Sequence, residues 1–107
     1  MAADTFLFND ENFSEATASG VSLVDLYADW CGPCKIMAPA IDKLATAYVE
    51  KAKVGKLNVD DSQLTAGKMG VTSIPTVIIF KDGAEIDRFV GVQSEENLAR
   101  AIDKHLA

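Results

Sequence analysis

Cysteine is scarce in this chain. Only Cys31 and Cys34 occur among 107 residues, which is too few for the disulfide framework of a small secreted domain. The two lie close together in the sequence, so a bond between them closes a loop that is too short to stabilise the folded state much. We therefore do not expect the pair to hold the fold together.

Long apolar runs are also missing. The longest strongly apolar stretch is residues 77–80, whereas a helix needs about 20 apolar residues to span a bilayer, so no membrane partner is expected. The first ten residues contain neither a basic segment nor an apolar one, which argues against a secretory signal or a transit peptide. A thiol pair in such a chain indicates a reducing compartment, and we expect the cytoplasm.

Basic residues are outnumbered by acidic ones. Ten Lys and Arg against sixteen Asp and Glu give a net charge of -6. Nucleic-acid binding needs an excess of basic residues for contacts with phosphates. No nucleic-acid partner is therefore expected.

Apolar periodicity predicts one α/β domain over residues 1–107, a length typical of a single domain. Residues 21–28 are apolar on both faces, as in a central strand covered by helices on both sides. Residues 33–50 have the spacing of a long helix in which Pro39 introduces a kink. The remaining predicted strands are residues 5–8, 54–59, 76–80 and 84–90, and the remaining helices are one capped at Asn9, one over residues 62–69 and one that begins at Ser94 and buries Leu98, Ile102 and Leu106.

The order of these elements predicts a mixed sheet with helices on both of its faces. Lys81-Asp82-Gly83 between the last two strands is a hairpin turn signal, so those strands should pair antiparallel.

Cys31-Gly32-Pro33-Cys34 stands where the central strand ends and the long helix begins. The unpaired N–H groups and the positive dipole at a helix N-terminus stabilise an anion, which favours a thiolate at Cys31. The spacing of three places Cys34 on the same helix face, within reach of a disulfide. Pro33 preorganises the first turn and Gly32 leaves room for another backbone.

Half of a zinc site is the alternative interpretation of the two cysteines. A four-cysteine centre would need two more, and the single histidine, His105, lies in the last turn of the last predicted helix. Zinc shared between two chains remains open.

Asp25 interrupts the strand that is predicted to be most buried. A charged carboxylate without a partner is costly there, so its pKa should be raised. We interpret it as a general acid or base for the cysteines that follow, with local pairing to a serine or a backbone group as the alternative. Lys56 lies in the next strand, where it would pair with Asp25 or lie on the surface.

Several of these motifs, in this order, resemble the thioredoxin family. The resemblance covers about residues 6–107, and Trp-Cys-Gly-Pro-Cys-Lys at 30–35 is its most specific part. It implies the thioredoxin fold, with a central mixed five-stranded sheet flanked by four helices. Leu26 and Tyr27 depart from the aromatic residues that are common at these positions. The other matching stretches are residues 24–29, 38–39, 56–60, 74–76, 80–83 and 90–91.

The resemblance implies a protein-disulfide oxidoreductase that reduces protein disulfides by dithiol–disulfide exchange. Cys31 would be the attacking thiol and Cys34 the resolving one, with Asp25 and Lys56 as a buried pair that transfers protons. Pro75, which the sequence pattern alone does not predict to be cis, would be a cis proline facing the disulfide. The apolar patch implied to receive an extended substrate segment comprises Trp30, Gly32, Pro33, Ile74, Pro75, Val90, Gly91 and Val92.

The resemblance also implies that the chain binds no cofactor and no metal. Its partners would be disulfide-containing proteins and a thioredoxin reductase, a flavin enzyme that draws electrons from NADPH. We expect a monomer. The alternative is a non-enzymatic binding subunit that uses the same apolar patch within a larger assembly.

Overall fold

The computed structural model describes residues 4–107. In chain order, the elements are β1 (Phe6–Phe8), α1 (Phe13–Ala16), β2 (Val21–Tyr27), α2 (Gly32–Ala47), β3 (Ala52–Asn58), α3 (Gln63–Lys68), β4 (Thr76–Lys81), β5 (Ala84–Val90) and α4 (Glu95–Leu106).

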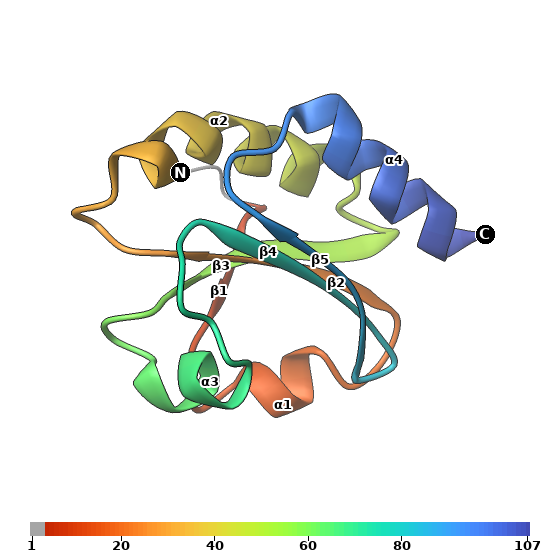
Figure 1. Cartoon of the computed structure of the whole chain (residues 1–107). Coiled ribbons are helices and arrows are strands. Elements are labelled where there is room, and N and C mark those ends of the chain that lie inside the picture. The colour runs from red at the N-terminus through yellow and green to blue at the C-terminus, as the bar shows by residue number, and fades with distance from the viewer. Residues whose placement is uncertain (1–3) are drawn as a thin grey trace.

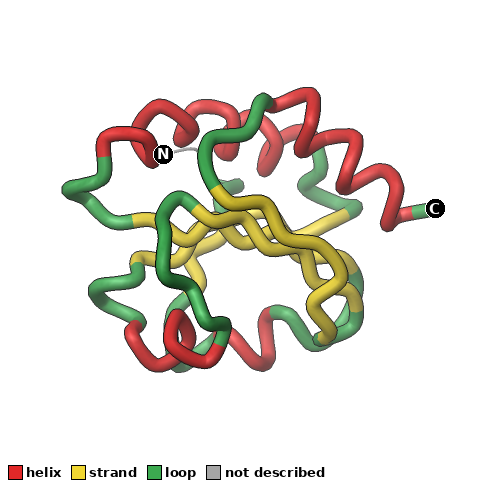
Figure 2. Tube along the Cα trace, viewed as in Figure 1, coloured by secondary structure: helices red, strands yellow, loops and turns green. Residues whose placement is uncertain are grey.

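The five strands form one sheet in the order β1-β3-β2-β4-β5, with β2 at its centre. The pairs β1–β3 and β2–β3 are parallel, and the pairs β2–β4 and β4–β5 are antiparallel. Helices α2 and α4 cover one face of the sheet, and α1 and α3 cover the other (Figure 1). Figure 2 shows the strand layer between the two helical layers. The predicted α/β architecture is confirmed.

Strand β2 divides its side chains between two cores. Val21 and Leu23 pack with residues of α2 and α4, whereas Val24 and Leu26 pack with Phe13 of α1 and with other residues of the opposite layer. Successive side chains of a strand point to opposite faces, so Asp25 follows Leu23 on the face covered by α2. The alternation therefore directs the one carboxylate of β2 toward the helix that carries the cysteines.

The turn between β4 and β5 has the predicted form. Asp82 and Gly83 both have positive φ angles, of 51° and 86°, as a two-residue type I′ hairpin requires. The Asp82 side chain also accepts a hydrogen bond from the Gly20 N–H at 2.8 Å. The hairpin tip is thereby bonded to the turn that precedes β2.

Helix α3 receives its N-terminal cap from another part of the chain. The Ser62 side chain makes no capping bond. Instead Asp10 accepts the backbone N–H of Thr65 at 2.8 Å and that of Leu64 at 3.4 Å. Hydrogen bonding by the Thr65 side chain, and then by these backbone N–H groups, lowers the pKa of the Asp10 carboxyl. The sequence gives no sign of this cap, because its two partners are far apart along the chain.

Several predicted details were wrong. The assigned first helix begins at Phe13 with Asn12 at its N-cap, whereas the Asn9 side chain accepts the N–H groups of Glu11 and Asn12, as a capping residue does, around the turn just before it. Helix α2 ends at Ala47, because the Tyr48 carbonyl accepts bonds from residues 51 and 52 and turns the chain into β3. Leu106 is exposed at the end of α4. Helix α2 runs without a break through Pro39, and the kink expected there stays a prediction.

Candidate active site

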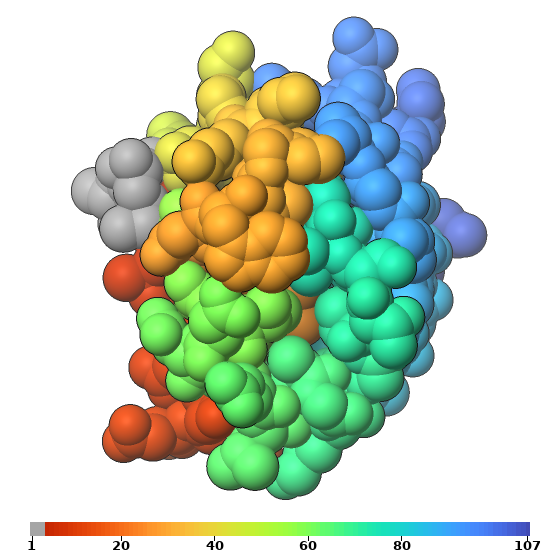
Figure 3. Space-filling view, turned by 60° about the vertical axis from the view of Figure 1, so that its left-hand side comes forward, coloured from red at the N-terminus to blue at the C-terminus, as the bar shows by residue number. Residues whose placement is uncertain are grey.

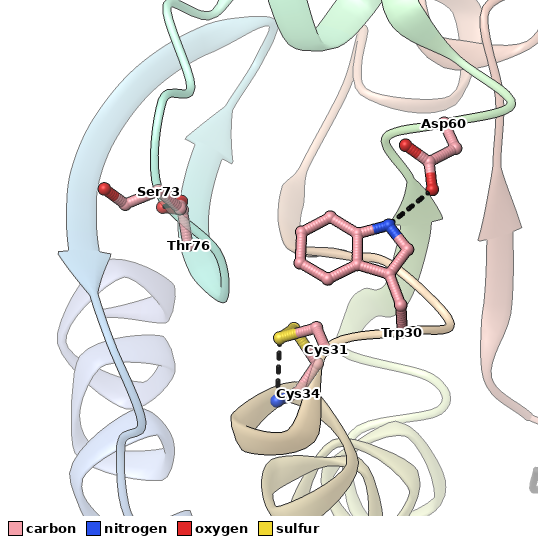
Figure 4. Close-up of a disulfide and its surroundings, with 6 residues drawn as sticks. All are labelled: Trp30, Cys31, Cys34, Asp60, Ser73 and Thr76. Atoms are coloured by element: carbon pink, nitrogen blue, oxygen red, sulfur yellow. Dashed lines mark hydrogen bonds between the residues drawn. A yellow bond between two sulfur atoms is a disulfide. The ribbon is translucent and has the colours of Figure 1, made fainter.

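The cysteine pair lies at the junction between β2 and α2. Cys31 is the N-cap residue of α2, and its sulfur accepts the backbone N–H of Cys34 at 3.2 Å (Figure 4). The two cysteines form a disulfide, with Cα atoms 5.3 Å apart. A helix has N–H groups without partners in its first turn, and the Cys31 sulfur satisfies one of them. The same donor would stabilise a thiolate at Cys31 after reduction.

Asp25 is buried, with only 2% of the residue exposed. Its Oδ1 atom accepts no hydrogen bond from the residues that the structure describes. Burial raises the pKa of the carboxyl to about 7, and the positive charge of Lys56 opposes this rise. Asp25 therefore exchanges its proton near neutral pH, as its position in the strand predicts.

Lys56 of β3 lies directly beside Asp25 in the parallel register of β2 and β3, which confirms its predicted place. Its Nζ atom lies over the ring of Tyr27, 4.8 Å from the ring centroid. An ammonium over an aromatic face is stabilised by the ring's electrons. Burial raises the pKa of the Tyr27 hydroxyl. The cation is thus held near the carboxylate by a ring that the sequence did not assign to the site.

A pocket of about 330 Å³ is shared by the buried carboxyl and Cys34. It is lined by Asp25, Lys56, Cys34 and Tyr27, together with residues that include Lys35 and Ala38 of the first turns of α2. Cys31 is not among the lining residues. The pocket has room for water and exposes the carboxyl of Asp25 and the ammonium of Lys56 to it, so a proton could pass between Asp25 and Cys34 without direct contact.

An apolar surface surrounds the disulfide. Trp30 is 71% exposed and Val90 is 62% exposed, although both are large apolar residues. Ile74 packs against the cluster formed by Ala28, Cys31 and Cys34. In Figure 3 the β2–α2 connection meets the segment that leads into β4 on this face. The structure thus brings together parts of the chain that the sequence keeps far apart.

The bond between Ile74 and Pro75 is cis, as the family resemblance implies. The Pro75 carbonyl accepts the Gly91 N–H at 2.8 Å. This bond ties the segment before β4 to the segment after β5. Pro75 and Gly91 therefore lie side by side, and the exposed side chains of Val90 and Val92 flank Gly91 in the sequence.

Asp60 is a site residue that the sequence analysis did not single out. Its Oδ2 atom accepts the Trp30 indole N–H at 2.9 Å (Figure 4). Strands β2 and β3 are parallel, so the loops after them leave the sheet at the same edge. Because the two loops share this edge, an acidic residue just after β3 could have been predicted to lie near Trp30.

Within residues 4–107 no group of three or more His, Cys, Asp or Glu side chains is arranged to hold a metal ion. The His105 Nε2 atom lies 3.4 Å from the Asp87 Oδ2 atom. Among the described helices, none is long and apolar enough to cross a bilayer.

The family follows from comparison with known proteins. Residues 4–104 match the family model described as Thioredoxin. The chain belongs to the thioredoxin family. A thioredoxin of Staphylococcus haemolyticus is 55% identical over 97 residues, which cover 91% of this chain and 93% of that protein. A thioredoxin of Staphylococcus saprophyticus is 54% identical over the same shares of the two chains.

Solved thioredoxin structures match the fold as well. A mutant thioredoxin from Halobacterium salinarum superposes with a TM-score of 0.89 at 33% identity, covering 100% of this chain and 96% of that chain. A thioredoxin of Malassezia sympodialis gives a TM-score of 0.87 at 32% identity, covering 96% and 91%. Thioredoxins are protein-disulfide oxidoreductases that carry no bound cofactor, and this chain is such an enzyme with a redox-active cysteine pair.

Proposed function

We propose that Cys31 is the attacking thiol and that Cys34 is the resolving thiol. The observation that carries this assignment is the position of the pocket, which reaches Cys34 from Asp25 but is not lined by Cys31. Cys31 instead caps α2 and follows the exposed Trp30. A nucleophile must face substrate, whereas a resolving thiol must lose its proton to a base inside the protein.

The proposed reaction has two exchanges. The Cys31 thiolate attacks one sulfur of the substrate disulfide, so a mixed disulfide forms and the other substrate sulfur leaves as a thiolate that takes a proton from water. Asp25 then accepts the Cys34 proton through water in the pocket. The Cys34 thiolate attacks the Cys31 sulfur, which releases the second substrate thiolate and restores the Cys31–Cys34 bond. The substrate gains two electrons and the chain loses two.

The apolar surface supports a proposal for substrate binding. We infer that an extended segment of a protein substrate lies against Trp30, Ile74 and Val90. An extended segment pairs through its backbone and leaves alternate side chains to fill apolar contacts. The rest of the proposed surface comprises Gly32, Pro33, Pro75, Gly91 and Val92.

The oxidised chain has to be reduced again after each turnover. We propose that a flavin-containing thioredoxin reductase supplies the electrons from NADPH, and that the chain works as a monomer in the cytoplasm. The experiment combines NADPH, a thioredoxin reductase and insulin, and follows NADPH oxidation. Insulin reduction that depends on this chain supports the proposal, and equal rates with and without the chain contradict it.

Two other functions predict different outcomes. If the chain were a binding subunit, Cys31→Ser would still bind the docking partner. The wild-type chain itself would then show no turnover of disulfides. A shared zinc site would leave stoichiometric zinc in protein purified with a reductant, which elemental analysis detects.

A further inference from the structure

Residues 70–75 connect α3 to β4 without regular secondary structure, yet they end in Ile74 and Pro75 beside the disulfide. Of these two residues it is Ile74 that packs against the cluster of the cysteines. The end of the segment is held by two hydrogen bonds. The Thr76 hydroxyl donates to the Ser73 carbonyl at 2.6 Å, and the Gly91 N–H donates to the Pro75 carbonyl at 2.8 Å. The start of the segment is held by a side chain of β5. The Arg88 Nη2 atom donates to the Met69 carbonyl at 2.7 Å.

Met69 is the C-cap residue of α3. Carbonyls at the end of a helix have no partner within the helix, and a cation near them is favoured by the helix dipole. Gly70 follows with a positive φ of 66°, which turns the chain away from the helix axis. The N–H groups of Gly70 and Val71 also donate to carbonyls of α3, and the Arg88 guanidinium adds a bond from outside the helix at the point from which the connecting segment departs.

A bulge in β5 orients Arg88 for this contact. Arg88 lies opposite Ile78 and Asp87 lies opposite Ile79, but the next pair along the strands joins Glu85 to Phe80. One extra residue of β5, Ile86, therefore has no partner. Residues three apart in a regular strand point to opposite faces, and one extra residue brings them to the same face.

The Arg88 side chain is fixed by Glu85 on that face. The Nε and Nη2 atoms of Arg88 each donate to one carboxylate oxygen of Glu85 at 2.8 Å. A planar guanidinium can hold a carboxylate with two parallel bonds and still reach a further acceptor. Arg88 is thus an oriented donor to the Met69 carbonyl, although its side chain is partly exposed.

We propose that Arg88 is a positioning residue for the substrate surface, acting through the Met69 carbonyl to set where residues 70–75 place Ile74 and Pro75. Strand β5 holds the start of this segment through Arg88, and Gly91, just after β5, holds its end. The inference rests on the proposed substrate surface. Protein disulfides, which need that surface, depend on Arg88, whereas small soluble disulfides, which need only the cysteines, do not.

The test compares Arg88→Gln with the wild-type chain on insulin and on oxidised glutathione. We expect the KM for insulin to rise roughly threefold to tenfold, as for the loss of one hydrogen bond of ordinary strength, with kcat retained. The rate with oxidised glutathione should change less than about twofold. Arg88→Lys keeps a charged donor and should recover part of the insulin KM.

Two further variants sharpen the comparison. Glu85→Gln removes the charge that orients Arg88, so it should give a smaller rise in the insulin KM. Arg100→Gln is the matched control, because Arg100 is exposed on α4 and its one described hydrogen bond, to Asn97, is 3.4 Å long. Hydrogen exchange should quicken at the Val71 N–H in Arg88→Gln, while the amides of β2 are unchanged.

An unchanged insulin KM in Arg88→Gln would overturn the inference. So would an equal loss of rate on both substrates, because that would mean general damage to the fold. Failure of the proposed function is separate from these results, since the wild-type chain itself would then reduce neither substrate.

Discussion

Asp25 and Lys56 lie side by side in register on β2 and β3, and both line the pocket that reaches Cys34. The Lys56 ammonium lies over the Tyr27 ring, so the positive charge is close to the carboxylate while the Oδ1 atom remains without a hydrogen bond from the described part of the chain. The carboxyl is therefore kept at a pKa where it can take and return a proton.

The buried carboxyl should destabilise the fold when it is charged. Burial raises the pKa of Asp25 from 3.8 to about 7. The free-energy cost of the charged carboxylate is absent below pH 4, grows as the pH rises to about 7, and is constant above that. Asp25→Asn should increase the free energy of unfolding at pH 8 by up to about 4 kcal/mol and leave it nearly unchanged at pH 4. Denaturant unfolding at both pH values measures this, and an equal effect at both would show that Asp25 is solvated.

The same carboxyl should set the pH dependence of the resolving step. Release of a mixed disulfide should accelerate as the pH rises to about 7 and then level off, because Asp25 is by then ionised. Asp25→Asn should slow release at pH 7 by roughly 100-fold. Lys56→Gln should move the midpoint to higher pH, since the Lys56 charge lowers the pKa of Asp25. Rapid quenching with acid gives the rates, and an unaltered profile in Asp25→Asn would exclude it as the base.

Trp30 should owe its orientation to Asp60. The chain contains a single tryptophan, so its fluorescence anisotropy reports only this side chain. Asp60→Ala removes the acceptor of the indole N–H, and we expect faster local motion and a higher KM for insulin. Asp61→Ala is the control because it changes the same loop and the same charge. Identical anisotropy in the Asp60 variant and the wild-type chain would contradict this role.

Asp10 should stabilise α3 from outside the helix. Hydrogen bonding by the Thr65 side chain and by the N–H groups of Thr65 and Leu64 lowers the pKa of its carboxyl. Asp10 therefore stabilises the fold above its ordinary pKa, and this contribution disappears as the pH falls through the lowered value. Asp10→Ala should speed hydrogen exchange at Leu64 and Thr65 and lower the unfolding midpoint at pH 7. Glu11→Ala, next in the chain and exposed, should do neither.

The sequence predicted those features that local patterns determine. The continuous apolar run of β2 predicted a central strand, and Asp82-Gly83 predicted the hairpin. Cys31-Gly32-Pro33-Cys34 after a strand predicted the start of a helix. The raised pKa of Asp25 followed from one carboxylate in an apolar strand.

Features that depend on distant partners were not predictable in this way. The Trp30–Asp60 bond and the Asp10 cap join residues 30 and about 55 positions apart. The contact of Arg88 with Met69 depends on a bulge that the run of residues 84–90 does not mark. The helical spacing predicts a helix that continues past Ala47, but α2 ends there. The Tyr48 hydroxyl donates to Asp103 at 2.7 Å. Tertiary contacts decided the first three of these features, and the local turn at Tyr48 ended α2.

The roles of the two cysteines are tested most directly by trapping the mixed disulfide with a substrate protein. Reduced Cys34→Ser is mixed with insulin, and covalent complexes are separated without reductant and mapped by mass spectrometry, with Cys31→Ser as the matched control. We predict an abundant mixed disulfide through Cys31 in Cys34→Ser, because attack continues while resolution is lost. No trapped complex from Cys34→Ser, or more complex from Cys31→Ser than from Cys34→Ser, would contradict the account.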